Sequence, residues 1–385
     1  MTSRLRVALL AAGALACGSC GGETTAPSGV PTNDLRQAFS HGTCKGSGIV
    51  RYAASPMAIA DVGQFIPLGV MTGGHVTPID HQYLLPLDLF AGRTRYNVVA
   101  PFTGNIVLIQ PRVKAAGDVG TAPVGSVDYR IVFEGSCTYW VYYDLVTQLE
   151  PSILAAGGSA LAANNSAYVR IPVTAGQLIG KVGGQTLDLG TVNADITLPG
   201  LLVPEHYVAE PWKIHSMDAL DYFDEPLRGQ LNALNRRKAL PRGGKIDFDV
   251  DGAAVGNWFL VGTNGYGGTG PGGGTYWTGH LSLAYGNIDP ALVMISMAFP
   301  DGSSRQWVVE GNTPDPAAIT VSSGVVKYEV KNWSGDSVRT SVSLPIAGVF
   351  AVQVLAGRQL RAEFFPGLRA STVAGFDAAA RTYER

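Results

Sequence analysis

A short stretch near residue 75 concentrates side chains that can do chemistry. His75, Asp80 and His81 fall within seven positions, so two of the six histidines of the chain lie close to a carboxylate. Imidazole nitrogens and carboxylate oxygens are common zinc ligands, and both groups also act as general acids and bases. A Gly-Gly pair before His75 and Pro78 after it shape the backbone. The alternative is that the two histidines only make local hydrogen bonds around a proline-containing loop.

The sequence around this stretch predicts the strands that would position it. Glycine is abundant, with 49 residues, and runs rich in Val, Thr and Tyr recur between Gly and Pro turns. This composition predicts a mostly β protein. Residues 96–109 alternate and turn at 102–105, which is typical of a hairpin. Residues 128–133 and 137–145 predict a second hairpin around Gly135.

Three ordered motifs between residues 70 and 192 resemble one family. They are Ala-Pro-x-x-Gly from Ala100, Tyr-x-Val-Tyr-x-x-Leu from Tyr139, and Val-x-Ala-Gly-Gln-x-Ile-Gly-x-Val-Gly from Val173. Together they resemble the lysostaphin-type (M23) metallopeptidases, which have the duplicated hybrid motif fold. The resemblance implies an N-terminal domain of this fold at residues 43–215.

The same resemblance implies a metal site with altered residues. M23 peptidases carry His-x-x-x-Asp, a hairpin histidine and His-x-His. Here His75 matches the first ligand, Asp80 lies five positions later, Asp144 replaces the hairpin histidine, and Thr186 and Asp188 replace His-x-His. The implied ligands of one zinc or other divalent ion are therefore His75, Asp80 and Asp188, with His81 as an alternative to Asp80.

The loss of both helper histidines predicts a catalytically degenerate domain. Amide hydrolysis needs groups that titrate near the working pH and donors that stabilise the oxyanion, which Asp144 and Thr186 do not supply. The remaining candidates for a catalytic role are Asp144, His81 and His206. The more ordinary reading of His206 and of His215 is that of loop residues packed over the sheet edge.

The N-terminus predicts export. Within residues 1–22, arginines precede an apolar stretch that is too short to span a bilayer. The stretch ends in Ala-Leu-Ala-Cys17, which resembles a bacterial lipobox and implies lipidation of Cys17; an ordinary cleaved signal is the alternative. Residues 23–42 predict a flexible tether. In an oxidising compartment Cys44 and Cys137 are expected to form a disulfide, the alternative being two unpaired thiols.

The second half of the chain predicts a separate β domain. Residues 216–241 are expected to form a helical connector of two helices, and residues 242–385 hold eight strand candidates, the first at 245–250 and the last at 360–365. These strands would form an antiparallel barrel or a β-sandwich. The motif Gly-x-Trp at residues 256–258 weakly resembles the first strand of calycin-type barrels. Residues 371–385 are expected to form a closing helix.

These observations leave three hypotheses about function. The first is an envelope lipoprotein whose M23-like domain is a binding or regulatory module for peptidoglycan or for an envelope protein that handles it. The second is an active metal-dependent peptidoglycan hydrolase with variant ligands. The third is a carrier of a small apolar ligand in the C-terminal β domain.

The net charge of the chain limits its possible partners, and the export signal predicts its location. The net charge of −2 argues against nucleic-acid binding, because a clustered basic surface would be needed. The expected location is the bacterial cell envelope, where the lipid anchor would hold the protein on a membrane, facing the periplasm or the exterior.

Overall fold

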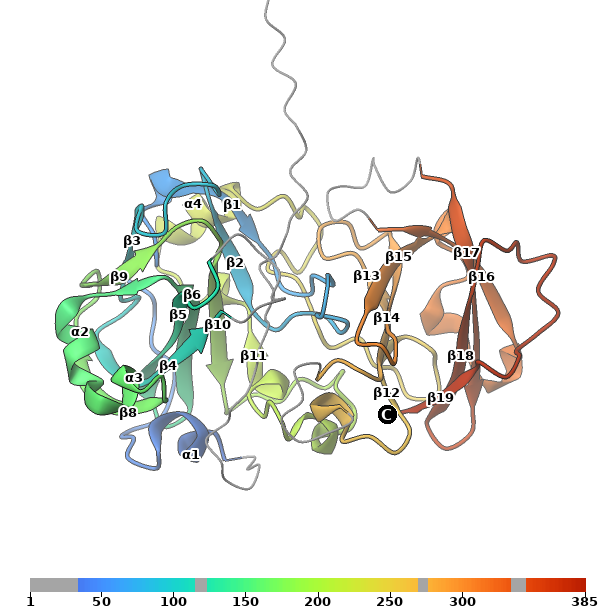
Figure 1. The fold of residues 1–385 in the computed structure, drawn as a ribbon, viewed down its shortest axis with the longest axis horizontal. Helices are drawn as coiled ribbons and strands as arrows, with labels where there is room; N and C mark the ends of the chain where they lie inside the picture. The colour runs from blue at the N-terminus through green and yellow to red at the C-terminus, as the bar shows by residue number, and fades with distance from the viewer. Residues whose placement is uncertain (1–33, 115–122, 269–275, 334–343) are drawn as a thin grey trace, which may run out of the picture.

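The protein is mostly β, as predicted. Its structure, a computed structural model, describes residues 34–114, 123–268, 276–333 and 344–385. The predicted signal segment with Cys17 and most of the predicted tether lie outside these residues. Figure 1 shows two β-rich halves side by side, with the chain passing from one to the other between β11 and β12. Among the described residues, no helix has the length and apolar character needed to cross a bilayer.

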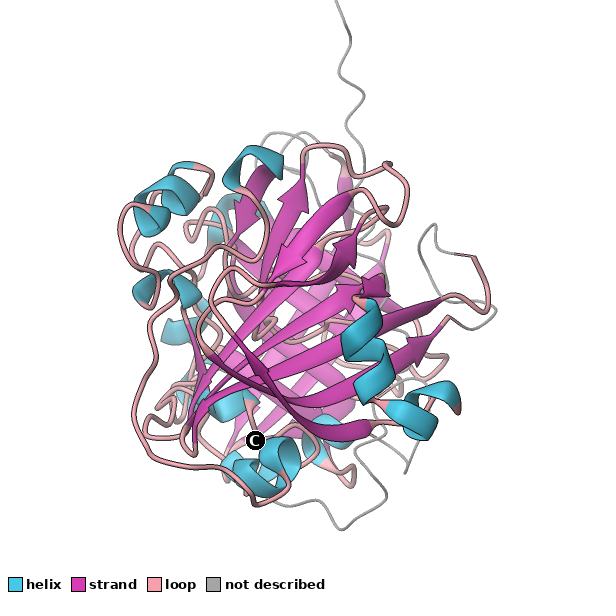
Figure 2. Cartoon of the chain, turned by 90° about the vertical axis from the view of Figure 1, so that its left-hand side faces the viewer, coloured by secondary structure: helices cyan, strands magenta, loops and turns pink. Residues whose placement is uncertain are grey.

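The N-terminal half is built on one large sheet. Figure 2 shows its strands crossing the middle of this half, with short helices towards its margins. In spatial order the strands are β1 (Val62–Ile66), β2 (Gln82–Pro86), β10 (Leu187–Asn193), β6 (Tyr139–Val146), β5 (Val127–Ser136), β4 (Gly104–Val113) and β8 (Ala167–Val173), while β11 (Ser216–Met217) pairs with β10. A three-stranded sheet of β3 (Tyr96–Val99), β9 (Leu178–Val182) and β7 (Gln148–Leu149) completes the half.

Both faces of the large sheet are covered at its centre. The residues of β6 are all buried, which explains why its sequence is almost continuously apolar rather than alternating. On one face Val141 and Tyr143 join a core that includes Val98 of the small sheet. On the other face Trp140 packs with Phe39 of α1 (Leu35–Ser40). Helices α2 (Pro151–Ala156) and α3 (Gly158–Ala162) pack near β8.

A disulfide fixes the start of the described chain to the sheet. Cys44 and Cys137 are joined, with their Cα atoms 5.0 Å apart. Beside the bridge, the amide of Cys137 donates to the carbonyl of Gly46 at 3.1 Å. The bridge therefore ties the N-terminal segment to the turn between β5 and β6.

The segment between the two halves has shorter helices than expected. It contains η2 (Pro204–Tyr207), η3 (Lys213–His215), η4 (Ala219–Asp221) and α4 (Leu227–Ala233). The second of the two helices expected in residues 216–241 is α4, which has only seven residues. Asn235 explains its end, because its Oδ1 accepts from the amide of Arg237 and its Nδ2 donates to the carbonyl of Arg242, which turns the chain out of the helix.

The C-terminal half is a closed antiparallel barrel, which confirms the barrel prediction over the sandwich. Its strands are β12 (Gly256–Leu260), β13 (His280–Tyr285), β14 (Val293–Ala298), β15 (Ser304–Val309), β16 (Val326–Asn332), β17 (Ile346–Leu355), β18 (Gln359–Pro366) and β19 (Arg381–Glu384). Short 3₁₀ turns η6 (Glu310–Asn312), η7 (Pro316–Ala318) and η8 (Val321–Ser323) precede β16, as η1 (Ile59–Asp61) precedes β1.

Two of the predicted elements of this half are wrong. Residues 371–385 hold no helix, and β19 instead closes the barrel by pairing with β12 and β18, with Tyr383 fully buried in the core. Residues 245–250 are not a strand. There, Asp247 accepts from the amide of Gly200, and Asp249 accepts from the amides of Leu202 and Asn257. The carboxylates of this stretch thus bind the backbone of other segments and hold it away from a strand ladder.

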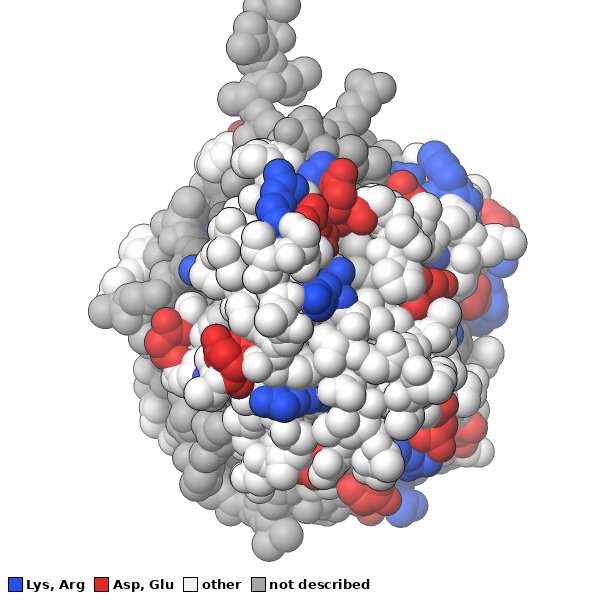
Figure 3. Space-filling model, turned by 90° about the vertical axis from the view of Figure 1, so that its right-hand side faces the viewer, with Lys and Arg blue, Asp and Glu red and all other residues white. Residues whose placement is uncertain are grey.

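Large side chains fill the inside of the barrel. Trp258, Trp307, Phe350 and Tyr328 are at most 1% exposed and belong to one apolar cluster. Figure 3 shows the outer face of this half, where acidic and basic side chains lie scattered among uncharged ones without a patch of one sign. The interior is therefore a packed core, and the visible surface has no electrostatic feature that selects a charged polymer.

Candidate functional site

The large sheet brings together the acidic residues that the sequence singles out. In the ladder of β10 with its two neighbours, Asp188 lies opposite Tyr83 of β2 and opposite Asp144 of β6. His81 and Asp80 come directly before β2. Residues in register share a face of the sheet, so Asp188 and Asp144 point to the same side. Segments that are more than 40 residues apart in the sequence thus meet in one place.

His81 lies between two carboxylates. Its Nδ1 is 3.2 Å from Asp80 Oδ1 and its Nε2 is 3.4 Å from Asp188 Oδ2, and all three side chains are at most 6% exposed. Thr186 donates to Asp188 Oδ1 at 3.1 Å. Burial alone would lower the pKa of His81, but the two carboxylates outweigh it and raise the pKa to about 9. The ring is therefore an imidazolium at neutral pH.

A lysine outside the sequence motifs completes this group. The Nζ atom of Lys213, in η3, lies 3.2 Å from Asp80 Oδ1 and 3.9 Å from Glu210 Oε2, and its side chain is 3% exposed. Burial alone would raise the pKa of Asp80, but the Lys213 ammonium and His81 hold it below its usual value. Burial raises the pKa of Asp188, and His81 opposes this effect.

Asp144 is held by two guanidinium groups. Arg112 of β4 donates to both oxygens of Asp144, at 2.9 and 2.7 Å, and Arg130 of β5 donates to Oδ2 at 2.9 Å. The amide of Leu145, whose φ is 65°, donates to Oδ1 at 2.9 Å. Although burial opposes them, Arg112 and Arg130 lower the pKa of Asp144 to about 2. A carboxylate clasped in this way cannot serve as a general base near neutral pH.

His75 lies at the margin of this group, on a loop that contacts the barrel. Its ring centroid is 6.0 Å from that of His81, and its side chain is half-buried. The loop carbonyl of Gly73 accepts from Ser304 and from Gln306 Nε2 of β15. A Cβ atom on Gly74 would lie only 2.8 Å from the ring of Trp277, so the loop and the barrel are in close contact.

His206 and His215 are placed elsewhere. The ring of His206 packs on Phe259 of β12, with centroids 5.3 Å apart, and burial lowers its pKa. His215 Nδ1 lies 2.6 Å from the carbonyl oxygen of Ile196. The segment that carries these histidines does reach the site, but through Lys213.

Of the three cationic residues outside the sequence motifs, the two arginines could have been found from the sequence. Arg112 and Arg130 stand in strongly apolar strand sequences, and a charge inside a strand that is buried on both faces needs a partner. Lys213, in contrast, stands in a loop sequence where a lysine is ordinarily exposed. Its burial follows from the packing of the two halves, which the sequence did not show.

We call the eight formally charged residues Asp80, His81, Arg112, Arg130, Asp144, Asp188, Glu210 and Lys213 the ion-pair cluster. Four cations face four carboxylates within it, so its formal charge is zero. Among the residues the structure describes, no three His, Cys, Asp or Glu side chains are arranged to hold a metal ion.

The ligand set inferred from the resemblance does not fit a metal in this arrangement. A zinc site needs converging donors whose charge is not already balanced. In the cluster, the carboxylates of Asp80, Asp188 and Asp144 each have a protein cation beside them, and a divalent ion would be placed next to the Lys213 ammonium and the His81 imidazolium. Like charges at such distances repel strongly in a buried site.

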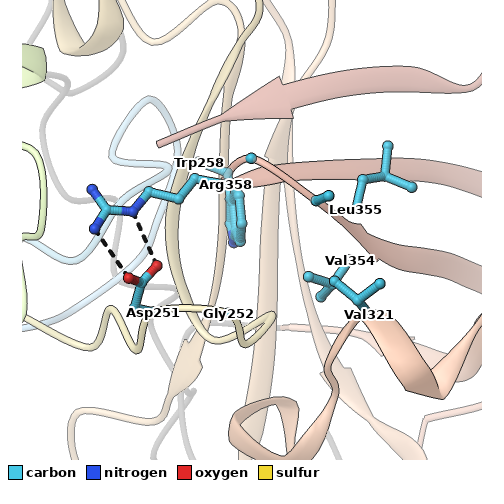
Figure 4. Close-up of a pocket in the computed structure, with 9 residues that line it drawn as sticks. Asp251, Gly252, Trp258, Val321, Val354, Leu355 and Arg358 are labelled. Atoms are coloured by element: carbon cyan, nitrogen blue, oxygen red, sulfur yellow. Dashed lines mark hydrogen bonds and ion pairs between the residues drawn. The ribbon is translucent and has the colours of Figure 1, made fainter.

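A pocket in the C-terminal half lies apart from the ion-pair cluster. It has a volume of about 410 Å³ and is formed by the β17–β18 hairpin, the chain before β12 and η8. In Figure 4, Val321, Val354 and Leu355 lie across an open space from Trp258, and Arg358 and Asp251 form a paired rim with both contacts at 3.0 Å. Because Asp251 neutralises Arg358, the rim offers no unpaired charge to a ligand.

Comparison of the chain with protein-family models, with curated protein sequences and with solved structures finds no match. The site is therefore defined by its own geometry: a neutral, buried cluster of ion pairs on the face of the sheet to which the motif resemblance assigns a metal.

Proposed function

We propose that this protein is an exported, lipid-anchored component of the bacterial cell envelope whose N-terminal domain is an M23-like module without hydrolytic activity. It would act by binding peptidoglycan, or an envelope protein that handles peptidoglycan. The motif order between residues 70 and 192 and the signal-like N-terminus support this proposal. The lipid anchor at Cys17 is part of the proposal.

One observation supports the proposed lack of hydrolytic activity. The carboxylates at the positions of the family's zinc ligands and helper groups are paired with lysine, arginine and histidine cations of the same chain. Peptide hydrolysis by this family needs a water molecule activated on a metal and groups that move protons. A cluster whose charges are already matched and whose side chains are buried offers neither an open coordination position nor access for a substrate.

The carrier hypothesis has less support. A carrier of an apolar ligand needs an internal cavity, and Trp258, Trp307 and Phe350 fill the space inside the barrel. The pocket beside Arg358 lies at one end of the barrel and is lined in part by exposed residues such as Val321. We therefore place the function in the N-terminal half.

The test combines metal analysis with two peptidoglycan assays on the soluble protein that begins near residue 24. The expected results are no stoichiometric metal, even after incubation with zinc, and no release of soluble fragments from purified peptidoglycan. The protein is also expected to sediment with insoluble peptidoglycan.

Two results would count against the proposal. One metal ion per chain that is lost in His75→Ala, together with release of fragments, would restore the hydrolase hypothesis. Failure to sediment with peptidoglycan or with envelope extracts would remove the binding role.

A further inference from the structure

The barrel has a pocket at one end, outside its packed interior. The pocket has a volume of about 410 Å³, and its lining comes from the β17–β18 hairpin, from β12 and the chain before it, and from η8. Sites for small molecules usually have volumes between about 300 and about 1,000 Å³. The pocket is therefore large enough for a small molecule, and it is separate from the interior site that the carrier hypothesis requires.

Apolar side chains form much of the wall of this pocket. Val354 and Leu355 come from the end of β17, and Val321 comes from η8. Trp258 lies across the open space from them (Figure 4). Val321 is 53% exposed, whereas Trp258 is 1% exposed, so the pocket runs from an exposed apolar rim to the edge of the barrel core. A ligand that covers this wall removes apolar surface from water, which favours binding.

Hydrogen bonds hold the lining in place without a ligand. Thr320 and Ser323 form a capping box around η8, and Thr320 also makes a β-bridge to Ala253 in the chain before β12. The indole Nε1 of Trp258 donates to the carbonyl of Ala254 at 2.8 Å. A ligand would therefore enter a site whose walls are already ordered, which lowers the entropic cost of binding.

The backbone beside the pocket leaves its mouth open. The lining includes Gly252 and Gly357, whose φ angles are 77° and 73°, and a Cβ atom on either would have no described residue other than its chain neighbours within 4 Å. Arg358 follows Gly357, and its own φ of 57° is uncommon for a residue with a side chain. The tip of the hairpin thus places a guanidinium at a position where glycine or asparagine is ordinarily favoured.

The rim of the pocket carries a neutral ion pair. Arg358 donates from Nε and Nη2 to the two oxygens of Asp251, each at 3.0 Å, and its Nη1 makes no hydrogen bond to the residues that the structure describes. Nη1 can therefore donate to an uncharged oxygen of a ligand, and the lone pairs that remain on Asp251 can accept from a hydroxyl or an amide. A charged head group would have to break the pair or lie beside a like charge.

We propose that this pocket binds a small uncharged molecule with an aliphatic body and a hydroxyl or amide head. The body lies among Trp258, Val321 and Val354, and the head meets the pair of Arg358 and Asp251. This binding is separate from the peptidoglycan role proposed for the N-terminal half and does not depend on it. Octanol is the probe, because it combines an aliphatic chain with one hydroxyl. Octanoate and octylammonium have the same chain length and carry a charge at neutral pH.

The experiment titrates the soluble protein that begins near residue 24 with each probe and follows the heat of binding. Bromooctanol gives a second readout, because its bromine quenches the fluorescence of a tryptophan that it contacts. The wild type is expected to bind one equivalent of octanol, and to bind it more tightly than either charged probe. In Asp251→Asn, Arg358 loses its counter-ion, so octanoate is expected to bind more tightly than octanol.

Variants of Val321 test whether octanol binds in this pocket. Val321→Glu places a carboxylate in the apolar wall and Val321→Trp fills the space, so both are expected to abolish octanol binding. Val321 is exposed, so both variants are expected to fold, which circular dichroism checks. The matched control is Val325→Glu, because Val325 follows the same turn and is 38% exposed but does not line the pocket. This control is expected to bind octanol as the wild type does.

Three results would overturn the inference. The first is a wild type that binds no octanol, which can be measured whatever the variants do. The second is undiminished octanol binding by folded Val321→Glu or Val321→Trp, because octanol would then bind elsewhere. The third is an Asp251→Asn protein that binds octanoate no more tightly than the wild type does, because the head group would then not meet Arg358. A failure of the proposed function looks different, because it would appear in the peptidoglycan assays.

Discussion

Replacing Asp144 with asparagine tests whether the ion-pair cluster has the charges that we assign to it. Asparagine keeps the shape of the side chain but leaves Arg112 and Arg130 without their shared counter-ion. The side chain of Asp144 is 3% exposed, so screening by solvent is small. Its pKa falls from 3.8 to about 2, and at about 1.4 kcal/mol for each pKa unit this gives roughly 2.5 kcal/mol of stabilisation.

The sign of the pH dependence follows from the lowered pKa. The stabilisation by the carboxylate is fully present above pH 3.8, the ordinary value, and is lost as the pH falls through about 2. Asp144→Asn should therefore lower the free energy of unfolding by about 2.5 kcal/mol at pH 7. The difference between the two proteins should shrink steadily as the pH is lowered from 4 towards 2.

The assay is urea unfolding at fixed ionic strength, followed by tryptophan fluorescence and far-ultraviolet circular dichroism. Asp224→Asn is the matched control, because Asp224 also pairs with an arginine, Arg51, at 2.6 Å, but both side chains are nearly half exposed. Exposed pairs contribute less than about 1 kcal/mol. If Asp144→Asn is no more destabilising than Asp224→Asn, or if its effect is the same at every pH, the charge assignment is wrong.

Three further predictions concern other contacts of the N-terminal half. The pKa of His81 is raised from 6.5 to about 9, so the charged imidazole stabilises the folded protein by roughly 3 kcal/mol. This stabilisation is complete below pH 6.5 and is lost as the pH rises through 9. The free energy of unfolding should fall over that range in the wild type but not in His81→Asn, and equal slopes would contradict a charged imidazole. Cys137→Ser opens the bridge to Cys44 across a sequence separation of 93 and should cost between about 2 and 5 kcal/mol, measured as a lower thermal midpoint under non-reducing conditions. Gly190→Ala places a methyl group 2.0 Å from the ring of Tyr142 and should destabilise by at least about 2 kcal/mol, while an unchanged thermal midpoint would show that the sheet can relax there.

The sequence predicted those parts of the structure that depend on local pattern. Period-two alternation and turn residues predicted most of the strands of both halves. The number of strand candidates in the C-terminal half left a barrel and a sandwich open, and the pairing of β19 with β12 and β18 closes the barrel. The exceptions have local causes. Residues 245–250 alternate like a strand, but Asp247 and Asp249 bind backbone amides of other segments. Residues 371–385 were expected to form a helix, whereas residues 381–384 form β19 and Tyr383 is buried in the barrel core.

Of the candidate site, the sequence predicted the three aspartates and His81, but not Glu210, the lysine and the two arginines. The resemblance to M23 motifs pointed to Asp80, Asp144 and Asp188, and the strand order places Asp144 beside Asp188 in the sheet. The partners that decide what these carboxylates do come from distant parts of the chain. Lys213 reaches the site because the segment before β11 folds over the sheet, and a contact of this kind leaves no periodic pattern in the sequence.

We explain the ion-pair cluster by the way it orients segments of the chain relative to one another, rather than by a gain in the free energy of unfolding. Apolar residues of similar volume usually stabilise a protein at least as well as buried ion pairs, because the charges must be stripped of water. Here the pairs join residues of six elements: the loop before β2, the strands β4, β5, β6 and β10, and the turn that carries Lys213. An ammonium that must meet Asp80 on one side and the ring of Tyr266 on the other allows only one placement of that turn between the two halves. We therefore interpret Lys213 as the residue that registers the C-terminal half on the N-terminal sheet and so fixes how this face of the sheet is covered.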